Sequence, residues 1–187
     1  MRIGLISDTH IPEARDALWP EVYDAFRDVD AILHAGDLHA LEVLDWLEQR
    51  CGVPVFAARG NGDDGGGGRP VTPADPRLKR AHVLTFGGLR VGLVHDLALP
   101  EWPPYRTLES MMDHHFGGPV DVIVYGDTHV EEVSELKGIL LVNPGSPTFP
   151  RNYTTRKGTI GFLEIDGGTA RAWVEWLPGA EPIPRRT

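Results

Sequence analysis

The sequence has almost no cysteine and no long apolar run. Cys51 is the single cysteine among 187 residues, so the chain can form neither an internal disulfide nor a cysteine-rich zinc site. The longest apolar stretch near the N-terminus, Ile3 to Ile6, is far too short for a signal sequence or a membrane span. We therefore expect a cytoplasmic protein that does not enter a membrane.

Basic residues are also in deficit. The chain has 18 Lys and Arg against 27 Asp and Glu, and its net charge is −9. A protein of this charge repels polyanions unless a metal ion or a basic patch intervenes. The densest basic run, residues 77–80, is too short to coat nucleic acid or to hold an anionic membrane. We expect no nucleic-acid coating and no membrane partner, and the sequence leaves a homo-oligomer open.

The rest of the composition is that of an ordinary globular domain. Hydrophobic residues make up 41% and charged residues 24% of the chain, which is close to the average for globular proteins. The 22 glycines and 16 prolines predict many tight turns in an ordered chain. A length of 187 residues fits one domain over 1–187, and the proline-rich segment from about 178 to 187 is expected to be a loose tail.

The N-terminal third alternates between short apolar runs and amphipathic segments. Strands are predicted over residues 2–6, 31–35 and 54–58, and helices over about 19–26 and 41–49. This alternation is typical of parallel strands joined by crossover helices.

The pattern changes after residue 80, where paired apolar runs flank short turns. Hairpins are predicted at 81–94, 131–142 and 159–177, with a helix over 105–115 and a strand over 120–125 between the first two. The combination predicts an α/β fold of two sheets packed face to face, with helices outside.

Polar side chains with metal-binding chemistry follow directly on several predicted strands. They are Asp8, His10, Asp37, Asn61, His95, Asp127 and His129. Strand carboxyl ends in an open α/β sheet share one edge, and ligands bind there. Carboxylate, imidazole and amide oxygen suit Mn, Fe, Zn or Mg. Since side chains alternate along a strand, Asp8 and His10 are expected on one side of an extended segment. The pattern predicts a divalent metal site.

The same residues have plainer interpretations. Asp8 and His10 could form a capped turn, and Asn61 could be only a turn residue. The two later histidines could be hydrogen-bonded core side chains, and Asp127 could form an ion pair without a metal. Their common placement at strand ends favours the metal site.

Other histidines and aromatics carry weaker signals. His34 lies in a buried strand, and His114–His115 ends a predicted helix, so both are interpreted as structural. His39 could line the cleft. Trp102 and Tyr105 could form a rim that faces the substrate, or could equally be packing residues.

The motifs taken together resemble a known family. In chain order they are Asp8-Thr9-His10, Gly36-Asp37, Gly60-Asn61-Gly62-Asp63, His95, Gly126-Asp127-Thr128-His129 and Asn143-Pro144-Gly145-Ser146. They resemble the calcineurin-like metallophosphoesterases, and within them the small bacterial and archaeal phosphodiesterases. The resemblance covers Met1 to about Leu177. It implies a four-layer αββα fold, a dinuclear metal centre and hydrolysis of a phosphate ester.

The resemblance also implies a division of ligands between two metal ions. One ion takes Asp8, His10 and His129. Asp37 bridges the two, and the other ion takes Asn61, His95 and the residue at position 127. Asp37, Asn61 and His95 are also the implied catalytic residues. Mn is the favoured metal, with Fe, Zn, Ni or Mg as alternatives. The reaction expected is attack by a bridging hydroxide on a small soluble phosphodiester.

Three positions depart from the family pattern. Asp127 stands where the family has histidine, Gly62 where relatives often carry cysteine or histidine, and Asp96 where a glycine often follows the mid-chain histidine. Aspartate can ligate the same metals through oxygen, but it lowers the positive charge of the centre. That change favours a singly charged diester over a monoester.

A function of another class remains open. A retromer subunit resembles the same fold and has lost catalytic residues, so the alternative is a catalytically weak or inactive scaffold that binds proteins. The number of retained ligand positions favours the enzyme.

Overall fold

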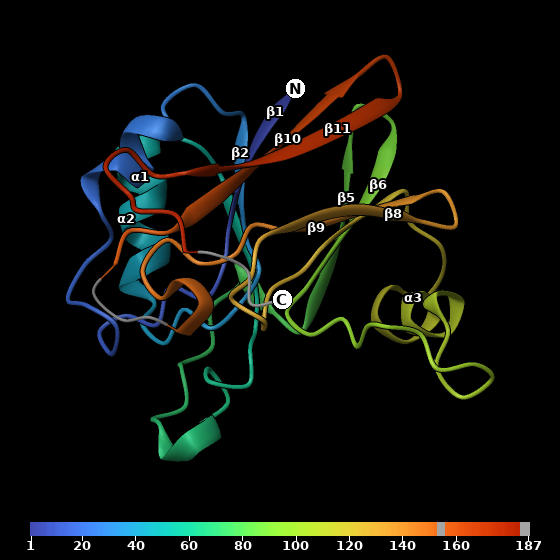
Figure 1. Cartoon of the computed structure of the whole chain (residues 1–187), viewed down its shortest axis with the longest axis horizontal. Helices are drawn as coiled ribbons and strands as arrows, with labels where there is room; N and C mark the ends of the chain where they lie inside the picture. Colours follow the sequence, from blue (N-terminus) through green and yellow to red (C-terminus); the bar gives the residue numbers. More distant parts are fainter. Residues whose placement is uncertain (153–155, 184–187) are drawn as a thin grey trace.

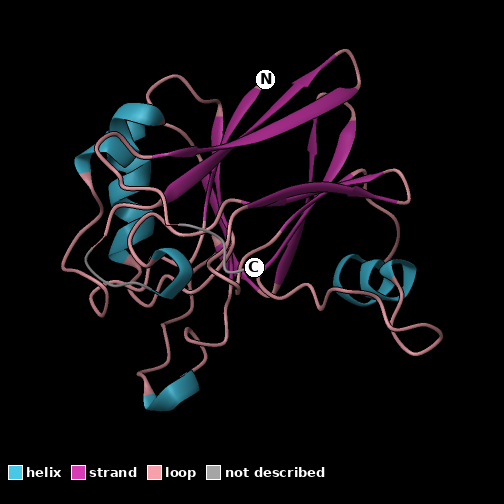
Figure 2. Ribbon diagram, in the orientation of Figure 1, coloured by secondary structure: helices cyan, strands magenta, loops and turns pink. Residues whose placement is uncertain are grey.

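Two mixed β-sheets pack face to face in the computed structural model of this chain, which describes residues 1–152 and 156–183. Helices cover the outer side of each sheet (Figures 1 and 2). The expected four-layer αββα order is therefore confirmed.

The first sheet has the strand order β11-β10-β1-β2-β3-β4. Its members are β1 (Arg2–Ile6), β2 (Ala31–His34), β3 (Val55–Ala58), β4 (Leu78–Lys79), β10 (Thr159–Asp166) and β11 (Thr169–Trp176). Strands β1 to β4 run parallel, and the β10–β11 hairpin adds antiparallel strands beside β1. The sequence did not predict β4, because two residues carry no periodic signal.

The second sheet has the order β5-β6-β7-β9-β8. Its members are β5 (Ala81–Phe86), β6 (Leu89–Val94), β7 (Val122–Val124), β8 (Glu132–Leu136) and β9 (Ile139–Asn143). Strands β6, β7 and β9 are mutually parallel, and the two hairpins occur where predicted.

The helices lie on opposite sides of the sandwich (Figure 1). They are α1 (Pro20–Ala25), α2 (Glu42–Cys51) and α3 (Leu108–Phe116), with short 3-10 turns at η1 (Gly66–Gly68) and η2 (Pro150–Asn152). Helix α3 begins at Leu108 rather than at residue 105, because the Thr107 side chain caps it by accepting a hydrogen bond from the Ser110 backbone N–H.

Apolar side chains fill each of the three spaces between layers. Val22, Phe26 and Leu44 pack between the first two helices and the first sheet. Leu33 and Leu93 lie between the two sheets. A third cluster, which includes Met111, Met112 and Ile123, lies beneath α3.

The parallel strands bring the predicted site loops to one edge. The loops after β1, β2 and β3 leave the first sheet there, and those after β6 and β7 leave the second.

No helix in the described residues is long and apolar enough to cross a membrane. Residues 178–183 form a turn and irregular chain, and the end of the expected tail, 184–187, lies outside the described residues.

Candidate metal centre

Three loops of the site have the same unusual backbone. In each, an aspartate and the histidine two residues later both adopt positive φ: Asp8 and His10 (53° and 45°), Asp37 and His39 (54° and 66°), and Asp127 and His129 (69° and 57°). Positive φ is uncommon for residues other than glycine, and such strained positions gather at functional sites.

This backbone corrects one prediction. Asp8 and His10 do not lie on an extended segment, since the backbone of both residues is in the left-handed region. Their side chains still converge. The cause is the turn that follows β1, rather than the alternation of side chains along a strand.

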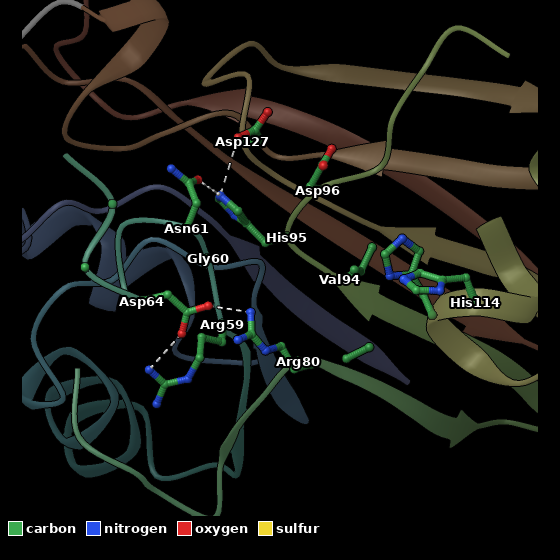
Figure 3. Close-up of a pocket in the computed structure, with 14 residues that line it drawn as sticks. Arg59, Gly60, Asn61, Asp64, Arg80, Val94, His95, Asp96, His114 and Asp127 are labelled. Atoms are coloured by element: carbon green, nitrogen blue, oxygen red, sulfur yellow. Dashed lines mark hydrogen bonds and ion pairs between the residues drawn. The ribbon is translucent and has the colours of Figure 1, made fainter. Parts of the chain in front are cut away.

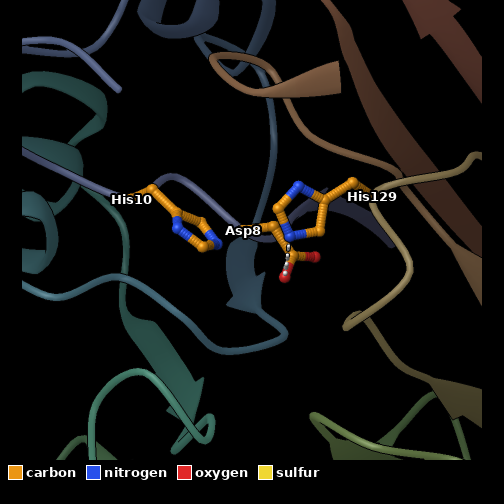
Figure 4. A group of neighbouring side chains, drawn as sticks. All are labelled: Asp8, His10 and His129. Atoms are coloured by element: carbon orange, nitrogen blue, oxygen red, sulfur yellow. Dashed lines mark ion pairs between the residues drawn. The ribbon is translucent and has the colours of Figure 1, made fainter. Parts of the chain in front are cut away.

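The first cluster consists of Asp8, His10 and His129 (Figure 4). All three residues are buried, and one ligand atom from each lies within 4.8 Å of the others. His129 Nε2 is 3.5 Å from Asp8 Oδ1. On the other side of the ring, His129 Nδ1–H donates to the Phe149 carbonyl at 3.0 Å. This bond orients the ring with Nε2 toward the carboxylate, as a metal ligand requires.

Asp37 lies between two histidines. Its Oδ2 is 3.5 Å from His10 Nε2, and its Oδ1 is 3.6 Å from His95 Nε2. Asp8, Asp37 and His95 form a second group of ligand atoms within 4.8 Å of one another. A carboxylate with one oxygen toward each histidine has the arrangement needed to bridge two ions.

His95 lies on the opposite side of Asp37 from His10, which we call the second side of the centre. Its Nδ1–H donates to the Ala35 carbonyl at 2.7 Å. Its Nε2 is 3.2 Å from Asn61 Oδ1 and 3.6 Å from Asp127 Oδ1. Burial acts to lower the pKa of His95, but the neighbouring Asp8 and Asp37 carboxylates outweigh it and raise that pKa. Nε2 therefore faces a group of oxygen acceptors that favours a cation at this position. The Asp127 side chain is 48% exposed, so it lies at the rim of the site.

Burial shifts the pKa values of two residues of the first cluster. Burial raises the pKa of Asp8 to about 6. Burial, followed by the neighbouring His129 and His39 rings, lowers the pKa of His10 to about 2. Asp8 Oδ1 and both His10 ring nitrogens are buried and have no hydrogen-bond partner among the described residues. Buried polar atoms without partners are costly, and a divalent ion would satisfy them. The residues present therefore fit a metal centre.

A buried carboxylate that the sequence argument overlooked holds two of these loops. Asp63 Oδ2 accepts hydrogen bonds from the backbone N–H groups of Asp37 (3.0 Å) and Gly60 (2.9 Å). Its Oδ1 accepts from the His39 N–H at 2.8 Å and from the Thr72 hydroxyl at 3.2 Å. In the sequence Asp63 appears only as the last residue of the Gly60-Asn61-Gly62-Asp63 motif, and no spacing rule marks it as an acceptor.

The motif at 143–146 also has a supporting role. The Asn143 side-chain amide donates to the Gly126 carbonyl at 2.8 Å and to the Thr128 hydroxyl at 3.0 Å. The Ser146 hydroxyl donates to the Asp8 carbonyl at 2.7 Å. Both side chains are fully buried, and their hydrogen bonds hold the loops that carry Asp8 and Asp127 in place.

A pocket of about 730 Å³ opens beside the second side of the centre (Figure 3). Asn61, His95 and Asp127 line it together with Arg80, His114 and His115. The last two histidines come from the end of α3. The sequence had suggested a purely structural role for them, because their distance from the site loops is set only by the packing of α3.

The aromatic pair at Trp102 and Tyr105 does not line this pocket. The two side chains are 65% and 79% exposed, with ring centroids 5.5 Å apart. Neither alternative offered by the sequence fits, since they form no rim of the pocket and are not packed into a core.

Comparison with known proteins agrees with this geometry. Residues 1–168 match the family model described as the calcineurin-like phosphoesterase superfamily domain. The chain is 38% identical over 167 residues to a protein of Methanothermobacter thermautotrophicus named as a probable metallophosphoesterase, covering 89% of this chain and 87% of that one. It is 26% identical over 175 residues to a protein of Methanocaldococcus jannaschii named as a phosphodiesterase, covering 89% and 94%.

The fold is also found among solved structures. Vps29 of Chaetomium thermophilum superposes with a TM-score of 0.67 at 21% identity, and the match covers 95% of each chain. At this identity the likeness concerns the fold alone.

Proposed function

The chain belongs to the calcineurin-like phosphoesterase superfamily, and from this premise we propose that it is a metal-dependent phosphodiesterase acting on small soluble phosphodiesters. The observation that carries the proposal is the position of Asp37, whose two carboxylate oxygens face His10 and His95 separately. The relative named as a phosphodiesterase supports the choice of substrate class.

The proposed centre holds two divalent ions. Asp8, His10 and His129 would hold one, Asn61, His95 and Asp127 would hold the other, and Asp37 would contact both. The mixed oxygen and nitrogen ligands without sulfur favour Mn, with Fe, Zn, Ni or Mg as alternatives. Bound ions of this kind would polarise a phosphoryl oxygen and supply a hydroxide nucleophile at neutral pH.

The protein residues prepare the site for these tasks. The carbonyls of Ala35 and Phe149 fix the rings of His95 and His129, so that each Nε2 points inward. Asp63 holds the backbone of Asp37 in its strained conformation. The centre therefore needs little rearrangement before a substrate binds.

The pocket and its charge favour a diester. The volume of about 730 Å³ beside Asn61 and His95 gives room for a small phosphodiester and its leaving group. Asp127 adds a negative charge at the rim of this pocket. A diester carries one negative charge and a monoester nearly two, so Asp127 repels the monoester more.

The test is hydrolysis by protein stripped with a chelator and then resupplied with single metals. We expect no turnover of bis(p-nitrophenyl) phosphate in the chelator, recovery that is largest with Mn²⁺, and slower turnover of p-nitrophenyl phosphate. Full activity of the stripped protein in the presence of the chelator would overturn the proposal.

A protein-binding scaffold is the second candidate. It is favoured by the exposed pair Trp102 and Tyr105, and the fold likeness to Vps29 is compatible with it. Stoichiometric binding of metal without hydrolysis of either ester would favour the scaffold over the enzyme.

A further inference from the structure

A third cluster of metal-binding side chains adjoins the proposed centre. Ligand atoms of His10, Glu13 and His39 lie within 4.8 Å of one another. His39 belongs to the loop that carries Asp37, and its ring packs edge-on against His10 with centroids 4.3 Å apart. His39 is not among the ligands proposed for the two ions.

The backbone of His39 matches that of the other two site histidines. It follows Asp37 by two residues, as His10 follows Asp8 and His129 follows Asp127, and all six residues have positive φ. The three loops thus present an aspartate and a histidine in the same local conformation. In two of them the histidine is a proposed metal ligand.

One nitrogen of His39 faces an anchored carboxylate. His39 Nδ1 is 3.5 Å from Glu13 Oε2. Arg69 holds that carboxylate with two hydrogen bonds, from Nε to Oε2 at 2.6 Å and from Nη2 to Oε1 at 2.8 Å. Because both carboxylate oxygens of Glu13 already accept hydrogen bonds from Arg69, Glu13 is better suited to orient the imidazole of His39 than to bind a cation itself. A proton on Nδ1 then leaves the lone pair on Nε2.

The other nitrogen of His39 has no partner. Nε2 is buried and makes no hydrogen bond within the described part of the chain, like the ring nitrogens of His10. Only 8% of the His39 side chain is exposed. Histidines that bind metals commonly have a carboxylate beside one ring nitrogen, while the other nitrogen holds the ion. Nδ1 and Nε2 of His39 have this arrangement.

Gly62 makes room for this ring. A methyl group at residue 62 would overlap His39 Nε2 and would also approach Asp37 Oδ1 to 3.0 Å. The φ of Gly62 is not in the left-handed region, so its backbone conformation does not require glycine. The absence of a side chain is instead explained by the space that His39 occupies.

We propose that His39 is an additional ligand of the metal centre, binding through Nε2 the ion that His10 also holds, with Glu13 and Arg69 as its positioning residues. The inference rests on the proposed metal centre and adds a nitrogen donor to it. Glycine at position 62 is then a requirement of the metal site.

The test is the affinity for Mn²⁺ of stripped protein, measured by isothermal titration calorimetry. We expect His39→Ala to weaken binding of one ion roughly 10-fold or more. Gly62→Ala should weaken the same ion, because its methyl group displaces the ring, and the double variant should lose no more than His39→Ala alone. The matched control is His82→Gln, which alters a buried histidine whose Nε2 is 2.9 Å from the Ala57 carbonyl, outside the centre. It should bind as the wild type does.

Unchanged Mn²⁺ affinity and stoichiometry in His39→Ala would overturn the inference. Asp8→Asn separates this outcome from failure of the centre itself: if it also binds normally, the proposed centre is wrong, and if it binds weakly, only the role of His39 is wrong. Should a variant fail to fold, the ring nitrogens of the wild-type protein can be followed by NMR during titration with Zn²⁺. The inference requires the His39 Nε2 resonance to shift together with that of His10, and a stationary resonance would refute it.

Discussion

The buried carboxylate of Asp63 accepts a hydrogen bond from the backbone N–H of Asp37 at 3.0 Å, and it thereby links the loop after β3 to the loop after β2. The same carboxylate accepts from Gly60, His39 and Thr72. Four donors converge on one side chain, which explains how Asp37 and His39 are kept at positive φ.

Replacement of Asp63 by asparagine should therefore destabilise the protein. In the wild type, backbone N–H groups donate to both carboxylate oxygens of Asp63. Asparagine replaces one of these oxygens by an NH₂ group, so at least one buried N–H loses its acceptor. We expect a loss of about 2 kcal/mol or more in the free energy of unfolding, measured by urea denaturation. The control is Asp64→Asn, which removes the charge from an adjacent, partly exposed residue that forms ion pairs with Arg59 and Arg80. Equal denaturation midpoints for the two variants would contradict this role of Asp63.

Replacement of Asp8 by asparagine should improve stability while it removes metal. Without metal, the buried Asp8 carboxylate has an oxygen with no hydrogen-bond partner. A neutral amide avoids the cost of burying a charge and can still accept the 2.6 Å bond from the Ser7 hydroxyl. At pH 8 in a chelator, we expect the variant to unfold at a higher urea concentration than the wild type. With saturating Mn²⁺ the order should reverse, because only the wild type is stabilised by binding. The same order in both conditions would be inconsistent with Asp8 as a ligand.

His82 gives a pH dependence that is independent of the metal centre. Burial lowers the pKa of His82 below its ordinary value of 6.5, against the raising effect of its hydrogen bonds to the Ala57 and Arg77 carbonyls. The folded pKa lies below the unfolded one, so the stability contributed by the neutral ring is present above pH 6.5 and is lost as pH falls through the folded pKa.

His82→Gln should flatten this acid limb, since glutamine can donate to the same carbonyls and does not titrate. We expect the wild type to lose more free energy of unfolding than the variant between pH 7.5 and pH 5, in urea titrations at both pH values. Parallel losses would show that the His82 pKa is not lowered.

Asp127→His should shift activity toward monoesters. Asp127 Oδ1 is 3.6 Å from His95 Nε2, and imidazole removes its negative charge from the second side of the centre. One charge at about 4 Å amounts to ~4 kcal/mol at an effective dielectric of 20, and the half-exposed position reduces this strongly. We expect the ratio of kcat/KM for the diester to that for the monoester to fall roughly 10-fold, the equivalent of 1.4 kcal/mol.

The control for this change is Asp96→Asn, which removes another aspartate that lines the same pocket but is not a proposed ligand. If Asp96→Asn alters the ratio as much as Asp127→His does, the effect comes from the general charge of the pocket and not from the metal site.

Most of the fold could be predicted from the sequence, because its strands are short apolar runs bounded by turns. The hairpin of β5 and β6 has the predicted bounds, with Gly87 and Gly88 at positive φ in its turn. Strand β4 could not be predicted, since Leu78 and Lys79 pair with β3 only through tertiary packing.

The residues proposed for the site could be chosen from the sequence, but their geometry could not. Asp8, Asp37 and His95 could be chosen because they follow buried strands. The left-handed backbone of these loops was not foreseeable, because aspartate and histidine do not demand positive φ as glycine often does. Asp63 and His39 depend on contacts between loops that are distant in sequence, and only the structure brings them together.

The central claim, a phosphodiesterase centre bridged by Asp37, is tested most directly by metal content and diester turnover in wild type and Asp37→Asn. Asparagine keeps an oxygen that can accept the 2.8 Å bond from the Gly62 N–H, so the variant should stay folded. We predict two Mn²⁺ ions per chain and turnover of bis(p-nitrophenyl) phosphate for the wild type, with fewer ions and no measurable turnover for the variant. A variant that keeps both its metal content and its turnover would contradict the account.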